Sequence, residues 1–274
     1  MLRSMQDLKT YTIGATDGTI GHVTDFYFDD ERWVIRYLVV ESGSWLASRK
    51  VLISPMSIGH PDWAKKSLPV AISRDQVKGS PDIDTDKPVS RQQEIDYLGY
   101  YDYPYYWEGA GLWGAGAYPN LTTPGNAGFL AIERPLLPPG AKDSTLGEVG
   151  RHEHDDLHLR SGLAVTGHET QAVDGSIGHV SGFLVDEETW AIRYLVVDTS
   201  NWWIGHQVLV PPQWVTGVSW PKREVSVHLD RDKVKFAPPY DPALPLDREK
   251  ENAIYRHYGR PAYWTAPEPA KCAA

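Results

Sequence analysis

The 274-residue sequence has a single cysteine, Cys272, so it can form no internal disulfide bond and contains no cysteine-rich metal site. It has no excess of positive charge either. Its 27 Lys and Arg residues and 36 Asp and Glu residues leave a formal net charge of −9, which argues against nucleic acid as the main partner. No run of about 18 apolar residues occurs, and the first residues lack the apolar core of a signal peptide. The sequence therefore predicts a cytoplasmic protein with no transmembrane segment.

The chain contains two copies of one sequence unit. The stretch DGTIGHVTDFYFDDERWVIRYLVV at residues 17–40 returns as DGSIGHVSGFLVDEETWAIRYLVV at residues 174–197. At a constant offset of 157, residues 2–107 align without a gap to residues 159–264, and about 40 of these 106 positions are identical. The period is far longer than that of solenoid repeats, which indicates a duplicated domain. Residues 2–107 are called the first repeat below, and residues 159–264 the second repeat.

The repeated stretch predicts two strands joined by a turn. In residues 33–40, apolar side chains occupy both the odd and the even positions, as in a strand that is buried on both faces. The preceding strand opens at the turn Asp17-Gly18, and a bulge at Gly21 would restore its alternation and bend it. Further short strands, separated by Gly and Pro, predict an all-β barrel or sandwich. These strands are expected at residues 51–53, 56–58 and 68–72 and at residues 208–210, 214–218 and 225–229.

Each repeat is predicted to end in a short helix. Ser90 and Asp247 are the expected N-caps, and Gln93 is placed to complete a capping box. The aromatic residues that follow each helix are expected to cover one end of a barrel, because so short a helix needs tertiary packing. Residues 108–158 are rich in Gly and Pro and are predicted to be a flexible linker. Residues 265–274 are predicted to be a disordered tail.

Three elements carry a resemblance to a known family. The DG-x-IG-x-V opening, the W-x-IRYLVV strand and the VL-[IV]-x-P strand, each present twice, resemble the PRC-barrel family. That family is named for a barrel in the H subunit of purple-bacterial photosynthetic reaction centres, and it includes the C-terminal domain of the ribosome-maturation factor RimM. The resemblance implies a small, strongly bent antiparallel β-barrel that docks on larger assemblies, with no shared catalytic motif.

From this resemblance and the repeat we expect two tandem antiparallel PRC-like β-barrels, each with a short C-terminal helix. A duplicated unit can bury matching surfaces as a homodimer does. We therefore expect the two barrels to pair within the chain around a pseudo-twofold axis.

Histidine and arginine recur at equivalent positions of the two repeats. His22 and His179 could carry protons, because imidazole titrates near neutral pH. We favour a structural role, in which the backbone of a bent strand satisfies each ring. Arg36 and Arg193 are expected to pair with an acid on a neighbouring strand rather than to bind an anion.

Tryptophans in the loop after the repeated stretch are the candidate partner-binding residues. Trp45 in the first repeat is followed at the equivalent loop of the second repeat by Trp202 and Trp203. Loops on a rigid barrel commonly carry binding function, and Trp is enriched at binding hot spots. An equally weighted alternative is that these side chains pack between the two barrels.

No catalytic or metal-binding motif stands out. The segment RHEHDDLH at residues 151–158 gathers three His with three acids, but its spacing matches no zinc motif, so no metal site is predicted. The glycine-rich GAGLWGAG lacks the Lys of a phosphate-binding loop. No nucleophile elbow occurs. We therefore expect no cofactor and no enzymatic activity.

The function expected from the sequence is a non-enzymatic docking or assembly module that binds another protein or protein complex. Two alternatives stay open on the strength of the family resemblance. One is a peripheral component of a photosynthetic or membrane electron-transfer complex, with peripheral membrane association. The other is a RimM-like factor in ribosome or RNA processing.

Overall fold

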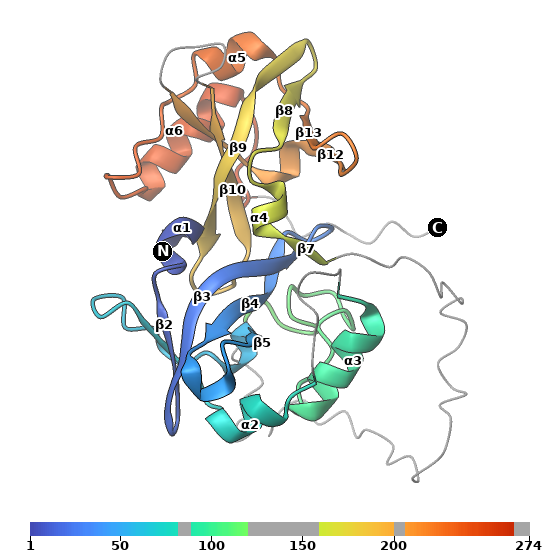
Figure 1. Cartoon of the computed structure of the whole chain (residues 1–274). Helices are drawn as coiled ribbons and strands as arrows, with labels where there is room; N and C mark the ends of the chain where they lie inside the picture. The colour runs from blue at the N-terminus through green and yellow to red at the C-terminus, as the bar shows by residue number, and fades with distance from the viewer. Residues whose placement is uncertain (82–88, 120–158, 200–205, 266–274) are drawn as a thin grey trace. The chain divides into compact units, whose positions relative to one another are not determined.

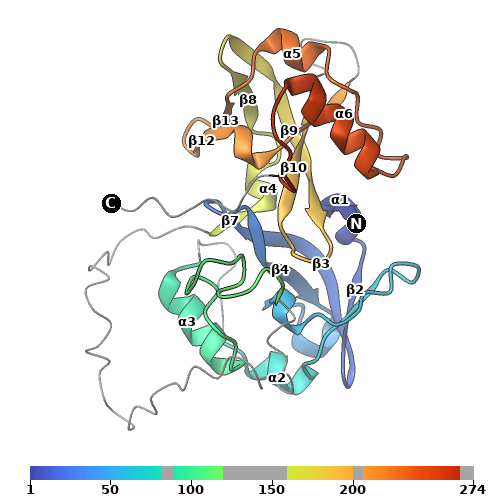
Figure 2. The same cartoon turned by 180° about the vertical axis from the view of Figure 1, so that it is seen from behind.

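The computed structural model of the protein describes residues 1–81, 89–119, 159–199 and 206–265, and these are mostly β (Figures 1 and 2). The chain divides into two compact units. The N-terminal unit comprises Thr10–Arg160, and the C-terminal unit combines Met1–Lys9 with Ser161–Ala274. The all-β prediction is confirmed at this level, since each unit is built on one sheet with a few short helices.

The sheet of the N-terminal unit has six strands among the described residues, in the order β5-β4-β3-β2-β6, and β7 also pairs with β3. The strands are β2 (Thr12–Ala15), β3 (Gly18–Asp29), β4 (Val34–Ser42), β5 (Lys50–Ile53), β6 (Ser67–Pro69) and β7 (Leu159–Ser161). The helical elements are the 3₁₀ turns η1 (Ser44–Leu46) and η2 (Pro55–Ser57) and the helices α2 (Arg74–Gly79) and α3 (Arg91–Tyr100).

The described part of the C-terminal unit has seven strands, in the order β11-β10-β9-β8-β13-β12, with β1 paired to β9. The strands are β1 (Leu2–Ser4), β8 (Glu169–Ala172), β9 (Gly175–Asp186), β10 (Ile192–Asp198), β11 (Gln207–Val210), β12 (Val215–Ser219) and β13 (Glu224–Val227). The helical elements are α1 (Met5–Leu8), α4 (Gly162–Val165), η4 (Pro212–Trp214), α5 (Arg231–Lys235) and α6 (Arg248–Tyr258).

The sheets are mixed, so the prediction of purely antiparallel sheets is wrong at one pairing in each unit. β2 runs parallel to β6, and β8 runs parallel to β13. Several intervening strands separate the members of each parallel pair along the chain, so the returning strand can enter the sheet from the same end as its partner. The strand predicted at residues 56–58 is instead the 3₁₀ turn η2, which begins at Pro55 and is capped by the Ser54 side chain.

The first strand of each repeat lies in the unit formed mainly by the other repeat. Arg3, on β1, donates from Nε to Oε2 of Glu187 at 2.9 Å, within the C-terminal unit. Arg160, the equivalent residue of the second repeat, donates from Nε to Oδ2 of Asp30 at 2.7 Å, within the N-terminal unit. The predicted domain boundaries at residues 2 and 159 therefore differ from those of the compact units, because these short segments are exchanged.

The predicted helix caps are confirmed. Ser90 accepts from the Gln93 amide and Gln93 accepts from the Ser90 amide, which together make the capping box of α3. Asp247 accepts from the amide of Lys250 at the start of α6. The helix α2 was not predicted, although Ser73 and Gln76 form the same S-x-x-Q box there.

The close approach of β3 and β4 explains the glycine that precedes His22. A Cβ built on Gly21 would lie 1.8 Å from the carbonyl oxygen of Glu41, so no larger residue fits without a backbone shift. The irregularity in the pairing of β2 with β3 falls between Thr19 and Gly21. The unpaired residue is thus Ile20, one position before the predicted bulge.

Part of the predicted linker is packed. Within residues 108–119, which the structure describes, Trp113 is buried with 3% of its surface exposed. The prediction of a flexible linker is therefore wrong for residues 108–119. The high glycine content suggested flexibility, whereas the buried Trp113 side chain anchors the segment. Residues 120–158 and 266–274 lie outside the described residues. None of the helices in the described ranges has the length and apolar character needed to cross a membrane.

Candidate functional site

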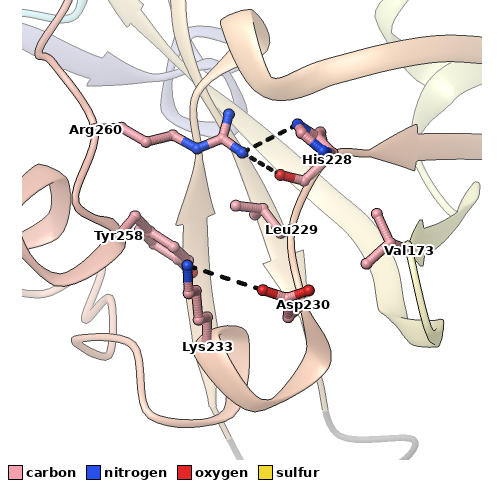
Figure 3. Close-up of a pocket in the computed structure, with 7 residues that line it drawn as sticks. All are labelled: Val173, His228, Leu229, Asp230, Lys233, Tyr258 and Arg260. Carbon is pink, nitrogen blue, oxygen red and sulfur yellow. Dashed lines mark hydrogen bonds and ion pairs between the residues drawn. The ribbon is translucent and has the colours of Figure 1, made fainter.

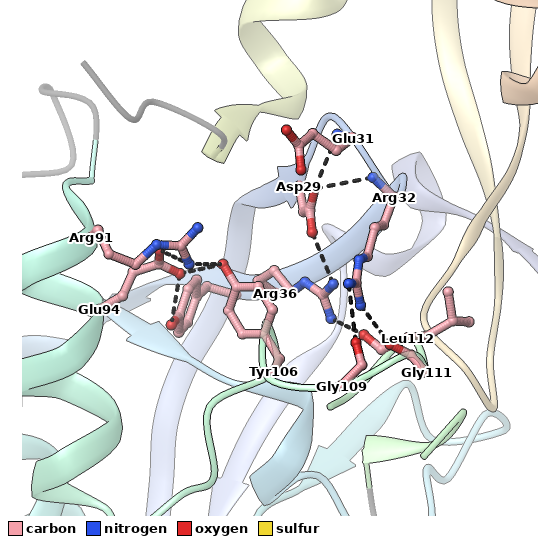
Figure 4. Close-up of polar contacts among 11 residues, drawn as sticks. Asp29, Glu31, Arg32, Arg36, Arg91, Glu94, Tyr106, Gly109, Gly111 and Leu112 are labelled. Atoms are coloured by element: carbon pink, nitrogen blue, oxygen red, sulfur yellow. Dashed lines mark hydrogen bonds and ion pairs between the residues drawn. The ribbon is translucent and has the colours of Figure 1, made fainter. Parts of the chain in front are cut away.

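A buried ion pair joins the ends of β3 and β4 in the N-terminal unit (Figure 4). Arg36, on β4, has no exposed side-chain surface, and its Nη2 donates to Oδ2 of Asp29 at 2.9 Å. Asp29 ends β3, and its Oδ1 accepts from the backbone amides of Glu31 and Arg32 in the turn. The prediction that Arg36 pairs with an acid on a neighbouring strand is confirmed.

A buried carboxylate on α3 lies beside this pair. Oε1 of Glu94 accepts hydrogen bonds from the hydroxyls of Tyr37 at 3.3 Å and Tyr106 at 2.5 Å. Its Oε2 accepts from Nη1 of Arg91 at 3.0 Å. The capping box sets where α3 begins, which places Glu94 one turn into the helix with 3% exposure. The Arg36 guanidinium lies 3.9 Å from the centre of the Tyr106 ring, so the two groups are contiguous. We call Asp29, Arg36, Tyr37, Glu94 and Tyr106 the first cluster.

Burial has the largest effect on the pKa values of four members of the first cluster. It raises the pKa of Glu94 to about 7, against the opposing effect of Arg91 and of the two tyrosine hydroxyls. Burial also raises the pKa values of Tyr37 and Tyr106 well above the ordinary value, so both hydroxyls stay protonated and able to donate. Burial lowers the pKa of Arg36, while Asp29 opposes that effect. Chemically, Glu94 is a group that can exchange a proton near neutral pH.

The chain after Tyr106 forms a turn that covers Arg36. Nη1 of Arg36 donates to the carbonyl oxygen of Leu112 at 2.5 Å, and Nη1 of Arg32 donates to that of Gly111 at 2.6 Å. The Trp113 ring centre lies 4.8 Å from the Arg36 guanidinium. A Cβ on Gly111 would lie 2.3 Å from the carbonyl oxygen of Gly116, so the turn requires glycine there. Residues 108–116 are called the cover segment below. They are held by main-chain contacts and one aromatic anchor.

The second repeat contains the same residues in the same arrangement, which we call the second cluster. Arg193 donates from Nη2 to Oδ2 of Asp186 at 3.2 Å. Oε1 of Glu251 accepts from the hydroxyls of Tyr194 at 2.9 Å and Tyr263 at 3.1 Å. The prediction for Arg193 is confirmed as well. Although burial acts to raise it, the pKa of Asp186 lies below its usual value because of the Glu188 amide and Arg193.

The second cluster is more open than the first. The side chain of Arg193 is 19% exposed and that of Asp186 is 19% exposed, against 0% for Arg36 and 7% for Asp29. Thr189 stands where the first repeat has Arg32, and its Oγ1 accepts from Nη2 of Arg193 at 3.3 Å. The second cluster therefore has the same chemistry but lacks the second arginine.

Sequence reasoning missed the carboxylate and tyrosines of both clusters. Glu94 is 57 positions from Tyr37 in the chain, so no local pattern joins them. One signal was present: every member of the first cluster is identical at the offset of 157. Identity at buried polar positions points to a network that both repeats need.

The candidate tryptophans are only partly described. Trp45, in η1, is half-buried, and its Nε1 donates to the carbonyl oxygen of Ile20 at 2.7 Å. The guanidinium of Arg74 lies 4.3 Å from its ring centre. Trp45 thus packs on its own unit while keeping part of its surface exposed. Trp202 and Trp203 lie outside the described residues.

The two candidate histidines lie on β3 and β9, away from the clusters. The His22 side chain is 59% exposed, and its Nε2 lies 3.8 Å from Oε2 of Glu41 on β4. His179 is half-buried and is paired in register with Asp198 on β10. An acid therefore faces each histidine across the strand pair, which the sequence had not assigned. Proton handling by either residue stays a prediction.

A small cavity of about 170 Å³ opens in the C-terminal unit (Figure 3). Arg260 crosses one side of it and donates to the carbonyl oxygen of His228. The Tyr258 hydroxyl at its wall has no hydrogen-bond partner among the described residues. At the position of Arg260 the first repeat has Tyr103, whose ring stacks on Tyr101 with centres 5.4 Å apart.

In the described part of the chain, no group of three or more His, Cys, Asp or Glu side chains is placed to bind a metal. The histidine-rich residues 151–158 lie outside the described residues. No family model matches this sequence, and no curated protein matches it.

Proposed function

We propose that this protein is a non-enzymatic docking module that binds segments of other proteins, built from two PRC-barrel-like repeats. The observation that carries the proposal is the cover segment. The first repeat holds a stretch of chain through Arg32 and Arg36, which donate to main-chain carbonyls, and through the buried Trp113. Hydrogen bonds to the main chain combined with an anchoring aromatic side chain are one recurring way in which modules bind peptides.

The repeated motifs support the family proposal, including closure of each sheet into a small barrel. The exchange of the segments Leu2–Ser4 and Leu159–Ser161 supports the proposal that the two barrels act as a pseudo-twofold pair, because domain-swapped homodimers trade segments in this reciprocal way. The net charge of −9 favours a protein over a nucleic acid as the partner.

Affinity capture of the tagged full-length chain from its own cells, after chemical crosslinking and with or without nuclease, tests the function. We expect a reproducible protein partner that resists nuclease, identified by mass spectrometry. Recovery of ribosomal proteins that nuclease removes would favour the RNA-processing alternative instead. Recovery of integral membrane proteins of one complex would favour the electron-transfer alternative. An empty capture would contradict docking.

The loop tryptophans can be tested in the same experiment. Trp202→Ala and Trp203→Ala should reduce capture if the loop contacts the partner, and Trp45→Ala is the matched variant in the first repeat. Circular dichroism of each variant separates lost contact from lost folding. Capture that is unchanged in folded variants would remove the loop from the binding surface.

A further inference from the structure

The two clusters present the same groups to a ligand, but only the first is covered by a described segment. In the first repeat, Nη2 of Arg36 pairs with Asp29 while Nη1 reaches the carbonyl oxygen of Leu112. In the second repeat, Nη2 of Arg193 pairs with Asp186 and Thr189. Its Nη1 has no hydrogen-bond partner among the described residues. The side chain keeps 19% exposure, so this donor is accessible.

The aromatic surroundings of the free donor are also preserved. The Arg193 guanidinium lies 4.4 Å from the centre of the Tyr263 ring, as that of Arg36 lies 3.9 Å from Tyr106. Tyr263 is only half-buried, whereas Tyr106 is 3% exposed because the cover segment lies over it. An incoming indole ring would find at Arg193 and Tyr263 the partners that Trp113 finds at Arg36 and Tyr106.

We propose that the surface formed by Arg193, Thr189 and Tyr263 binds a tryptophan flanked by glycines in a segment of a partner protein. The cover segment indicates the chemistry of this ligand. There the carbonyl oxygen of Leu112 accepts from the arginine, and the following residue, Trp113, supplies the indole. This inference rests on the proposed docking function and names the site and the ligand class for it.

The proposed occupant is a segment of another protein, because the described segment of this chain that has the matching chemistry is already held elsewhere. The cover segment is already held in the N-terminal unit through Arg32 and Arg36. The residues that follow Thr265 read APEPAKCAA and contain neither an aromatic side chain nor a glycine. A second copy offers the same cover segment, which its own first repeat holds. A partner segment therefore fits the chemistry better than the cover segment or the residues that follow Thr265.

The second site lacks an equivalent of Arg32, and this should lower its affinity for the ligand. Arg32 donates to two carbonyls of the cover segment, those of Gly111 and Gly109. Thr189, in its place, has a short uncharged side chain and supplies no guanidinium donor. A charged hydrogen bond typically contributes enough to change an affinity by about tenfold or more. The second site should thus release its ligand readily, as suits reversible docking.

The test uses a labelled synthetic peptide, EGAGLWGAGA, which has the sequence of residues 108–117. Its binding to the full-length protein is followed by fluorescence anisotropy. We expect saturable binding that weakens at least about tenfold when the peptide Trp is replaced by Ala. Arg193→Lys should weaken binding by a similar factor, because an ammonium cannot serve Asp186 and a carbonyl with the planar geometry of guanidinium. Arg256→Ala, a change at an exposed residue of α6, is the matched control and should have no effect.

A variant that is expected to bind the peptide more tightly separates binding from folding, because loss of folding cannot increase the affinity. Thr189→Arg introduces the residue that the first repeat has at this position, and it should tighten peptide binding severalfold by adding carbonyl contacts. Tightening in Thr189→Arg and weakening in Arg193→Lys would together support the site.

Three results would overturn the inference: no saturable binding, binding that is indifferent to both substitutions, or binding that appears only after residues 266–274 are deleted. The last result would make the tail the occupant. If affinity capture still recovers a partner that the peptide does not displace, the docking function survives and this site alone fails.

Discussion

The two clusters contain the same five residues at equivalent positions, yet among the described residues one is sealed and the other is more open. Asp29 and Arg36 are shielded by the cover segment, whereas Asp186 and Arg193 each keep 19% exposure. A buried ion pair depends on its partner far more than an exposed pair does, because removing one member leaves a charge in a medium that cannot solvate it. The same arrangement of side chains is thus covered in the first repeat, whereas the described residues leave the ion pair of the second repeat partly exposed.

The largest expected effect comes from breaking the sealed ion pair. Asp29→Asn should lower the free energy of unfolding by about 3–5 kcal/mol, because the Arg36 charge stays buried without its counter-ion. Asp186→Asn should cost about 1 kcal/mol, since water reaches Arg193. Urea denaturation of the two variants measures both values. Equal losses would mean that the cover segment does not isolate the first cluster.

Removing the anchor of the cover segment should make the first cluster resemble the second. Trp113→Ala should cost about 3 kcal/mol, as truncation of a buried Trp commonly does. It should also allow the peptide EGAGLWGAGA to bind a second equivalent on the same molecule, because Arg36 is then exposed. Denaturation and binding stoichiometry report the two effects. A stoichiometry that does not rise would show that Arg36 stays covered without the Trp113 side chain.

The raised pKa of Glu94 predicts a pH dependence of stability. The unfolded chain releases this proton near pH 4.5, whereas the folded protein holds it up to about pH 7. Between these values the folded state binds more protons, so the free energy of unfolding falls as pH rises, by roughly 3 kcal/mol in all. This contribution is complete below about pH 4.5 and lost above about pH 7.

Glu94→Gln should remove this slope, because an amide does not titrate in that range. Unfolding free energies measured from about pH 4.5 to about pH 8 give the comparison with the unaltered protein. Stability of the variant that falls with pH as steeply as before would assign the slope to another group.

The smallest effect tests the exchange of the first strands. Arg3→Glu should destabilise the protein by about 1 kcal/mol or less, because the pair with Glu187 is partly exposed. Adding Glu187→Arg should restore stability, whereas adding Asp30→Arg should not. Rescue by Asp30→Arg instead would mean that Arg3 lies in the unit formed mainly by its own repeat.

Local patterns in the sequence predicted much of the fold. The alternation in residues 33–40 predicted β4, and the S-x-x-Q pattern at Ser90 predicted the start of α3. These features depend on neighbours within about four positions, so a short window contains all the information needed. An acid on a neighbouring strand was predicted as the partner of Arg36, and the structure identifies it as Asp29.

Other features depend on groups that are distant in the chain. The carboxylate of Glu94 meets Tyr37 only when α3 packs on β4, and its high pKa follows from that packing. The cover segment was predicted to be a linker because glycine is typical of flexible chains, yet the same glycines permit the close turn around Trp113. Composition cannot separate these two uses.

The sequence by itself determined the duplication, the main strands and the helix caps, because each is recorded in residue identity or in local spacing. Only the tertiary structure decided which sheet the segments Leu2–Ser4 and Leu159–Ser161 join, since both read LRS and either sheet offers the same pairing. Tertiary structure also decided that one cluster is sealed and the other open. Arg36 is covered because residues 108–116 fold back over it, and that contact depends on tertiary packing rather than on a local sequence pattern.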